Sequence, residues 1–172
     1  VAEALGIYGV KQDIAVKWPN DVLWQKRKLA GILIELSGEA YNICNAIIGV
    51  GLNVNMPQKL AQEIKQPWCS IAQITKDIPQ RNKLAGLLLD RLLTTLDEFQ
   101  KNGLKPFLEK WRELDVVYGK KVTIITPSHQ RISGIGSGVN DKGYFLLKDS
   151  SNKIHSFATG EVSLKVHAYK EC

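Results

Sequence analysis

Two lysines flank an asparagine–aspartate pair in the stretch VKWPNDVLWQKRKLAGILIEL, residues 16–36. Lys17 stands just before a Trp-Pro break, and Lys28 stands at the start of a long apolar run. If the flanking runs pair as a hairpin, the two ammonium groups converge, and they repel each other unless an anion lies between them. We therefore predict a phosphate or carboxylate site here, with Lys17 and Lys28 as its cations.

The residues between the lysines suit the same chemistry. Asn20 offers both a hydrogen-bond donor and an acceptor, and Asp21 can orient Mg²⁺ or an incoming amine. A simpler interpretation is that KWPND forms a proline-broken turn with an Asx hydrogen bond, and that the lysines are solvated strand ends. The spacing alone leaves both interpretations open.

The stretch GVGLNVN, residues 49–55, resembles a phosphate-binding loop only superficially. Val54 occupies the third glycine position of GxGxxG, and no GxxxxGK[ST] motif occurs in the chain. Its glycines instead allow close backbone approach in a buried strand. Asn53 and Asn55 either read a purine edge or cap a turn, and Trp68 is either a core anchor or a stacking lid.

Alternating and helical patterns predict the elements that position these residues. Strands are expected over 13–18, 22–25, 28–36 and 41–55, joined by short turns, which favours an antiparallel or mixed sheet. Helices are expected over 1–9, over 81–102 and from 106, and Gly103 ends the second of these. The apolar stripe of that helix, which we expect to be core, consists of Leu84, Leu88, Leu92, Leu96 and Phe99.

After Asp115 the pattern changes to five short strands separated by turn residues, over 121–126, 130–139, 143–149, 153–159 and 162–166. Five strands in so short a stretch favour a small barrel. The sequence therefore predicts an α+β chain with one domain over 1–114 and a second over 115–172.

Composition excludes several classes of protein. No apolar run is long enough for a membrane helix and no secretion signal opens the chain, so we expect a cytoplasmic protein. The cysteines, Cys44, Cys69 and Cys172, show no metal-ligand or disulfide spacing. Beyond Val116 the chain has eight Lys/Arg against four Asp/Glu, which suits a nucleic acid or an acidic protein, but no recognition-helix pattern supports the former.

Taken together, VKWPND, RKLAGILIEL and GVGLNVN closely resemble the signature of the biotin protein ligases, the bacterial biotin–[acetyl-CoA-carboxylase] ligase family. The likeness extends through the Trp68 loop and the helices to GIGSGVNDKGYFLL and TGEVSL, and so covers essentially the whole chain. It implies part of a class II synthetase-like catalytic domain, a mixed or antiparallel sheet with helices, followed by a small SH3-like β-barrel.

The resemblance implies a two-step, ATP-dependent ligation with Mg²⁺. Biotin and ATP form biotinyl-5'-adenylate, and a lysine of the biotin carboxyl carrier protein of acetyl-CoA carboxylase then takes the biotinyl group. By the same resemblance the catalytic residues are Lys28, Lys17 and Asp21, with Asp21 as the metal-binding position. The implied biotin- and adenylate-binding residues are Lys28, Gly31, Asn20, Trp18, Asn53 and Trp68.

Two features of the family are not found in these 172 residues. They are the glycine- and arginine-rich biotin-binding loop of the GRGRxGR type and the amino-terminal helix-turn-helix. Without the helix-turn-helix we expect no DNA binding from this chain, and without a long apolar run we expect no membrane association. One alternative is a non-catalytic binding or assembly module, and another is an adenylating enzyme similar to lipoate ligases. The family also makes a homodimer possible.

Overall fold

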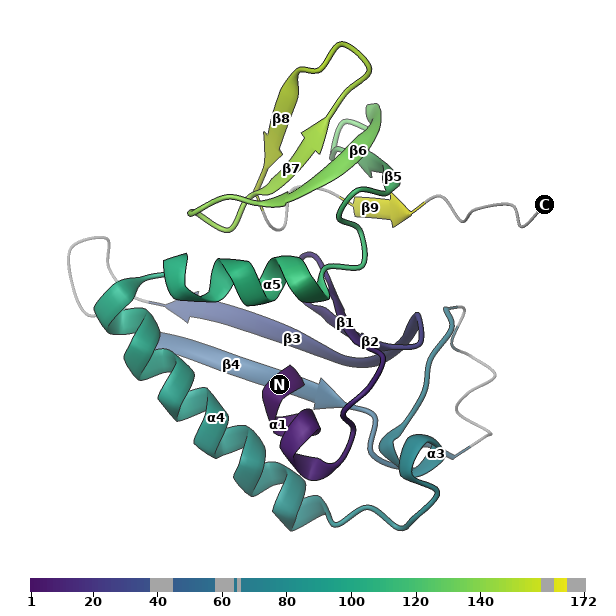
Figure 1. The fold of residues 1–172 in the computed structure, drawn as a ribbon, viewed down its shortest axis with the longest axis vertical. Coiled ribbons are helices and arrows are strands. Elements are labelled where there is room, and N and C mark those ends of the chain that lie inside the picture. Colours follow the sequence, from purple (N-terminus) through teal and green to yellow (C-terminus); the bar gives the residue numbers. More distant parts are fainter. Residues whose placement is uncertain (38–44, 58–63, 65, 159–162, 167–172) are drawn as a thin grey trace. The chain divides into compact units, whose positions relative to one another are not determined.

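A computed structural model gives the protein as two compact units and describes residues 1–37, 45–57, 64, 66–158 and 163–166. The first unit comprises residues 1–15 and 20–93, and the second comprises residues 16–19 and 94–172 (Figure 1). The four residues 16–19 therefore belong to a unit whose other members lie far along the chain. The predicted sequence positions Cys44, Cys172 and the turn over 159–162 fall outside the described residues.

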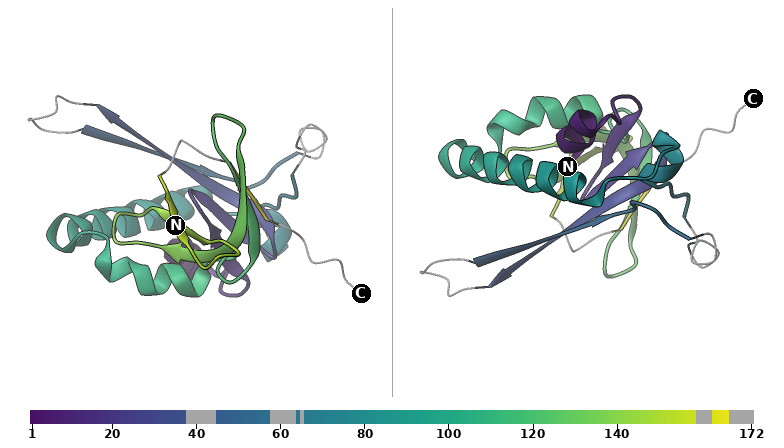
Figure 2. Two further views of the ribbon diagram at one scale, coloured as in Figure 1. Left: turned by 90° about the horizontal axis from the view of Figure 1, so that it is seen from above. Right: turned by 90° about the horizontal axis from the view of Figure 1, so that it is seen from below.

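The sequence predicted an antiparallel or mixed sheet, and the structure has a sheet of strand order β1-β2-β3-β4 in which β2, β3 and β4 pair antiparallel. These strands are β1 (Ile14–Lys17), β2 (Asp21–Trp24), β3 (Arg27–Ser37) and β4 (Asn45–Leu52). The β2–β3 turn consists of Gln25 and Lys26, one residue earlier than the tip predicted at Lys26 and Arg27, and both have positive φ. Positive φ at both central positions is typical of the tight hairpin turn that matches strand twist. Figure 2 shows β3 and β4 running side by side as a long ribbon.

Helices cover one part of this sheet and complete the core of the first unit. They are α1 (Ala2–Tyr8), α3 (Ile71–Thr75) and the first half of α4 (Arg81–Asn102). No helix was predicted where α3 lies, although it begins with a capping box between Ser70 and Gln73. The buried core contains Leu5, Val10, Val22, Leu29, Ala30, Cys69, Ile71 and Leu84.

The apolar stripe of α4 is not all core, contrary to the prediction. Leu84 is 3% exposed, whereas Leu96 is 40% exposed and Phe99 is 50% exposed. The bounds and end of the helix are as predicted, since Gly103 follows it with φ 66° and its N–H bonds to the Phe99 carbonyl. Helical periodicity therefore identified the element correctly, but the number of its turns that pack against a neighbour depends on the surrounding structure.

The second unit contains a short 3₁₀ turn η1 (Lys105–Phe107), α5 (Leu108–Leu114) and a five-stranded antiparallel sheet ordered β8-β7-β6-β5-β9. The strands, all close to the predicted ranges, are β5 (Lys121–Ile125), β6 (Arg131–Val139), β7 (Phe145–Lys148), β8 (Ile154–Phe157) and β9 (Ser163–Val166). Closure of this sheet into a barrel stays a prediction. Its core contains Trp18, Val117, Val122, Ile124, Phe145 and Leu147.

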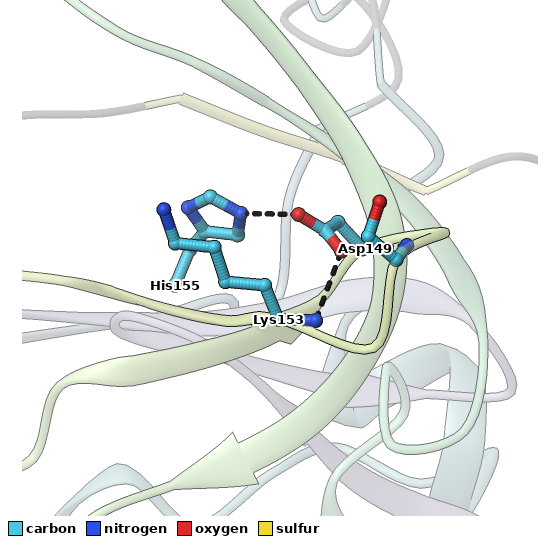
Figure 3. A network of polar contacts seen from close by, with 4 residues as sticks. Asp149, Lys153 and His155 are labelled. Carbon is cyan, nitrogen blue, oxygen red and sulfur yellow. Dashed lines mark hydrogen bonds and ion pairs between the residues drawn. The ribbon is translucent and has the colours of Figure 1, made fainter.

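The β7–β8 connection is held by one carboxylate (Figure 3). Asp149 accepts the backbone N–H groups of Ser151 at 2.8 Å and Lys153 at 3.0 Å, and its other oxygen pairs with His155 Nε2 at 2.7 Å. The hydrogen bond from His155 is the main reason that the pKa of the Asp149 carboxyl lies below its usual range. The network holds the tight turn between β7 and β8.

The two compact units are grouped by contacts, with one break inside α4 after Leu93 and with residues 16–19 in the second unit. Residues 16–19 join that unit because Trp18 is buried in the core of the five-stranded sheet, although its sequence neighbours belong to the first sheet. The domain boundary at Asp115 stays a prediction. Within the described ranges, none of the helices has both the length and the apolar content needed to cross a bilayer.

Candidate functional site

Three glycines make one patch of the first sheet free of side chains. Gly31 of β3 lies opposite Gly51 of β4, and Gly49 lies opposite Leu33. Directly paired residues of an antiparallel ladder share a face, so all three glycines lie on the same side of the sheet. A shallow cavity of about 440 Å³ lies over this patch, lined by Asn20, Gly31, Ile32, Leu33, Gly49, Val50 and Gly51. We call the patch formed by Gly31, Gly49 and Gly51 the glycine floor.

An ion pair lies directly against this floor. Lys28 Nζ is 2.6 Å from Asp21 Oδ1, and the two side chains are 30% and 16% exposed. A Cβ atom on Gly31 would be 3.4 Å from Lys28 Nζ and 3.9 Å from Asp21 Oδ1. Lys28 thus lies beside a surface that a ligand can approach to backbone distance, and it remains partly open to solvent.

A bulge in the β2–β3 ladder brings Lys28 to this face. The register pairs Val22 with Ala30 but Leu23 with Lys28, which leaves Leu29 as an extra residue in β3. In a regular strand, residues three apart, such as Lys28 and Gly31, point to opposite faces. The extra residue turns Lys28 toward the face of Gly31, while Leu29 stays buried.

The backbone of Lys28 is fixed from a second side by the segment that contains Trp68. The N–H of Lys28 donates to the Pro67 carbonyl at 2.9 Å, and the N–H of Cys69 donates to the Lys28 carbonyl at 2.9 Å. Trp68 and Lys28 accordingly form a parallel bridge. The sequence did not indicate this contact, because a single bridge has no periodicity to detect.

Asn53 ties the same segments together with its side chain. Its Nδ2 donates to the Lys28 carbonyl at 3.3 Å and to the Cys69 carbonyl at 3.1 Å. Both donors of this carboxamide are therefore used to hold the chain around Lys28, and the oxygen Oδ1 is the polar atom that Asn53 can still offer. Asn20 is similar, since its Nδ2 donates to the Ile32 carbonyl at 2.8 Å while its side chain borders the cavity.

The roles of the remaining predicted site residues stay predictions, and their positions are as follows. Trp18 is 2% exposed in the core of the second unit, where its Nε1 donates to the Gly143 carbonyl at 3.1 Å, so its contact with adenylate stays a prediction. Lys17 ends β1 and is half-buried, and its convergence with Lys28 stays a prediction. Trp68 is half-buried, which fits either an anchor or a lid, and Asn55 is exposed.

Asp21 is a carboxylate of this site that could help to hold a metal ion. Across the described part of the chain, no three His, Cys, Asp or Glu side chains gather as a metal-binding group. Mg²⁺ usually takes one or two carboxylates together with substrate phosphates and water. Asp21 is the carboxylate beside the glycine floor, so it fits the single protein ligand that such a metal needs.

Comparison with known proteins identifies relatives of both units. The Biotin/lipoate A/B protein ligase family model matches residues 2–53, and the Biotin protein ligase C terminal domain model matches residues 117–165. The bifunctional ligase/repressor BirA of Escherichia coli K12 is 34% identical over 165 residues, which are 96% of this chain and 50% of that protein. The biotin–[acetyl-CoA-carboxylase] ligase of Mycobacterium tuberculosis H37Rv is 30% identical over 135 residues, which are 78% of this chain and 47% of that protein.

The fold is also that of solved relatives. The structure of the biotin protein ligase from Aquifex aeolicus in complex with biotin and ATP has a TM-score of 0.79 and 29% identity, covering 96% of this chain and 67% of that chain. The predicted α+β architecture is confirmed by this similarity. The chain spans about half the length of the curated relatives it matches.

Proposed function

Because the chain belongs to the biotin protein ligase family, we propose that its glycine floor and the Lys28–Asp21 pair take part in joining biotin to ATP. The product is biotinyl-5'-adenylate with release of pyrophosphate, and the biotinyl group then passes to a lysine of a carrier protein. The solved relative that was crystallised with biotin and ATP supports this choice of substrates.

The position of Lys28 against Gly31 is the observation that carries the proposal. When the biotin carboxylate attacks the α-phosphate, negative charge concentrates on the phosphoryl oxygens. A cation held beside that point stabilises the transition state by about 3–4 kcal/mol, by analogy with a single oxyanion donor. Hydrogen bonds on both sides of its backbone hold Lys28 before any substrate arrives.

The glycine floor would let the ring system of a ligand come close to this cation. With no side chain on Gly31, Gly49 or Gly51, a ring system can lie directly on the backbone of β3 and β4. Leu33, which lies on the same face as these glycines, supplies an apolar edge to the same cavity. An apolar, shallow surface with one adjacent charge suits a bicyclic ring that ends in a carboxylate.

The roles we propose for the neighbouring polar groups follow from the charge and the hydrogen-bonding atoms that each group presents. Asp21 holds the Lys28 ammonium group and is the ligand that the protein can offer to Mg²⁺, which would neutralise phosphate charge when bound with ATP. The Oδ1 atom of Asn53 can accept from the adenine N6 amine, because both of its N–H groups are already used. Lys17 would supply a second cation, and Trp68 would cover the adenine; both roles are part of the proposal.

The partner we propose is the biotin carboxyl carrier protein of acetyl-CoA carboxylase, and this choice is supported by the Mycobacterium tuberculosis relative, whose name gives acetyl-CoA carboxylase as its substrate. Association into a homodimer and a cytoplasmic location belong to the same proposal. A pure binding module and a lipoate-adenylating enzyme are the competing functions, and the experiment separates them.

The test is to incubate the 172-residue chain with biotin and α-labelled ATP-Mg and to look for biotinyl-5'-adenylate by chromatography. We expect the adenylate to form and expect excess lipoate to leave its yield unchanged. Apo carrier domain added afterwards should become biotinylated, and the labelled AMP should be released from the adenylate. If the chain forms no adenylate but binds the carrier in calorimetry, the result would favour a binding module over the proposed function. If the chain uses lipoate in preference to biotin, lipoate would be its substrate.

A further inference from the structure

The residues just before Asn20 and Asp21 are held within the second unit by three interactions. The carbonyl of Val16 accepts a hydrogen bond from the N–H of Val116 at 2.9 Å, and Val16 and Asp115 form an isolated parallel β-bridge. Trp18 Nε1 donates to the Gly143 carbonyl at 3.1 Å, and the indole packs on Phe145 with 5.5 Å between ring centroids. Trp18 is 2% exposed and Phe145 is fully buried.

This anchoring is more extensive than a strand end requires. A tryptophan buried with its N–H satisfied contributes a large contact area and a fixed orientation, and its backbone neighbours inherit that restraint. Asn20, which borders the cavity, and Asp21, which pairs with Lys28, follow Trp18 by only two and three residues. Asn20 and Asp21 are also held from the other side, by the hydrogen bonds between Asn20 and Ile32 and by the pairing of Asp21 with Gly31.

We propose that Trp18 is a positioning residue, through which the core of the five-stranded sheet fixes the segment that carries Lys17, Asn20 and Asp21. This inference rests on the proposed function. It gives the carboxy-terminal sheet a role in adenylation without any contact of its own with substrate. In this account, loosening the Trp18 anchor widens the range of positions of Asn20 and Asp21 while the strands of the first sheet stay paired.

The test compares two anchor variants with a core variant of the same sheet. Trp18→Phe keeps an aromatic ring on Phe145 but removes the N–H that Gly143 accepts, and Phe145→Leu removes the ring partner. Leu147→Val is the control, since Leu147 is fully buried in the same core two residues further along β7. Chemical unfolding first establishes that the control loses as much global stability as the anchor variants.

Two readouts are then taken on the folded chains. Amide hydrogen exchange of a peptide covering residues 17–24 should accelerate about tenfold in Trp18→Phe and Phe145→Leu, the factor expected for the loss of one buried hydrogen bond. The KM for ATP in biotinyl-5'-adenylate formation should rise more than kcat falls. In Leu147→Val both quantities should stay within about twofold of the wild type, because Leu147 makes neither the hydrogen bond nor the ring contact that holds Trp18.

Equal hydrogen-exchange rates of the 17–24 peptide in all three variants would refute the claim that Trp18 restrains this segment. Faster exchange in the anchor variants with unchanged KM and kcat would refute its role in positioning the site residues. If the wild-type chain forms no adenylate, the proposed function fails. Hydrogen exchange, with calorimetric titration of ATP-Mg in place of KM, still decides whether Trp18 holds the segment.

Discussion

A single methyl group added to the glycine floor should separate ligand binding from folding. In Gly49→Ala the new Cβ would have only the Leu33 carbonyl near it, at 3.7 Å, which is an ordinary van der Waals contact. Alanine also restricts the unfolded chain more than glycine does, so we expect stability to be unchanged or to rise by about 0.5–1 kcal/mol.

The same methyl group projects into the cavity where we place the ligand. Overfilling a packed site costs about 1–3 kcal/mol, which corresponds to about a 5- to 150-fold loss of affinity. Calorimetric titration of biotin and of ATP-Mg measures that loss, and thermal unfolding measures stability. Gly86→Ala is the matched control, since a Cβ at Gly86 on α4 meets nothing within 4 Å. Unaltered affinity in a well-folded Gly49→Ala chain would refute the placement of the ligand on the floor.

Three further outcomes follow from particular contacts. Asp21→Asn keeps an acceptor for Lys28 but removes the carboxylate, so the Mg²⁺ concentration needed for half-maximal adenylate formation should rise about tenfold; an unchanged requirement would exclude Asp21 as the ligand. Burial raises the pKa of the Asp115 carboxyl, so its contribution to stability is greatest below the ordinary carboxyl pKa and is lost as pH rises through the raised value. Asp115→Asn should therefore stabilise the fold by about 1 kcal/mol at neutral pH and by much less near pH 3.5, as measured by urea unfolding at both values; equal gains would contradict this sign. In Gly134→Ala the Cβ would collide with the Lys148 carbonyl, so we expect a loss of about 3 kcal/mol in unfolding free energy, and a wild-type melting temperature would show that β6 and β7 can separate.

Much of the fold could be predicted because local patterns determine it. Alternation identified the strands on either side of Gln25 and Lys26, and Gly103 marked the end of α4. The exposed turns at the end of that helix could not be predicted, because periodicity identifies a face and not what covers it. The placement of residues 16–19 in the second unit follows from the burial of Trp18, which composition could not assign to either core.

The site was predicted in its residue types more than in its geometry. The sequence singled out Lys28, Asp21 and the glycines of GVGLNVN, and the structure gathers these residues on one face of the sheet. The partner of Lys28 could not be read from the chain, because the Leu29 bulge breaks the period of two that assigns side chains to faces. Asn53 was considered for adenine, and its use in holding the Lys28 backbone became visible only with the hydrogen bonds in place.

The rate of biotinyl-5'-adenylate formation in Lys28→Ala tests the central claim most directly, with Lys26→Asn as the control that removes an exposed cation from the adjacent turn. Asparagine tolerates the positive φ of Lys26, so the control should fold and react as the wild type does. We predict a fall of about 10²–10³ in kcat for Lys28→Ala, the loss expected for one preorganised charge at the phosphoryl group. A folded Lys28→Ala chain that forms adenylate as fast as Lys26→Asn would contradict the account.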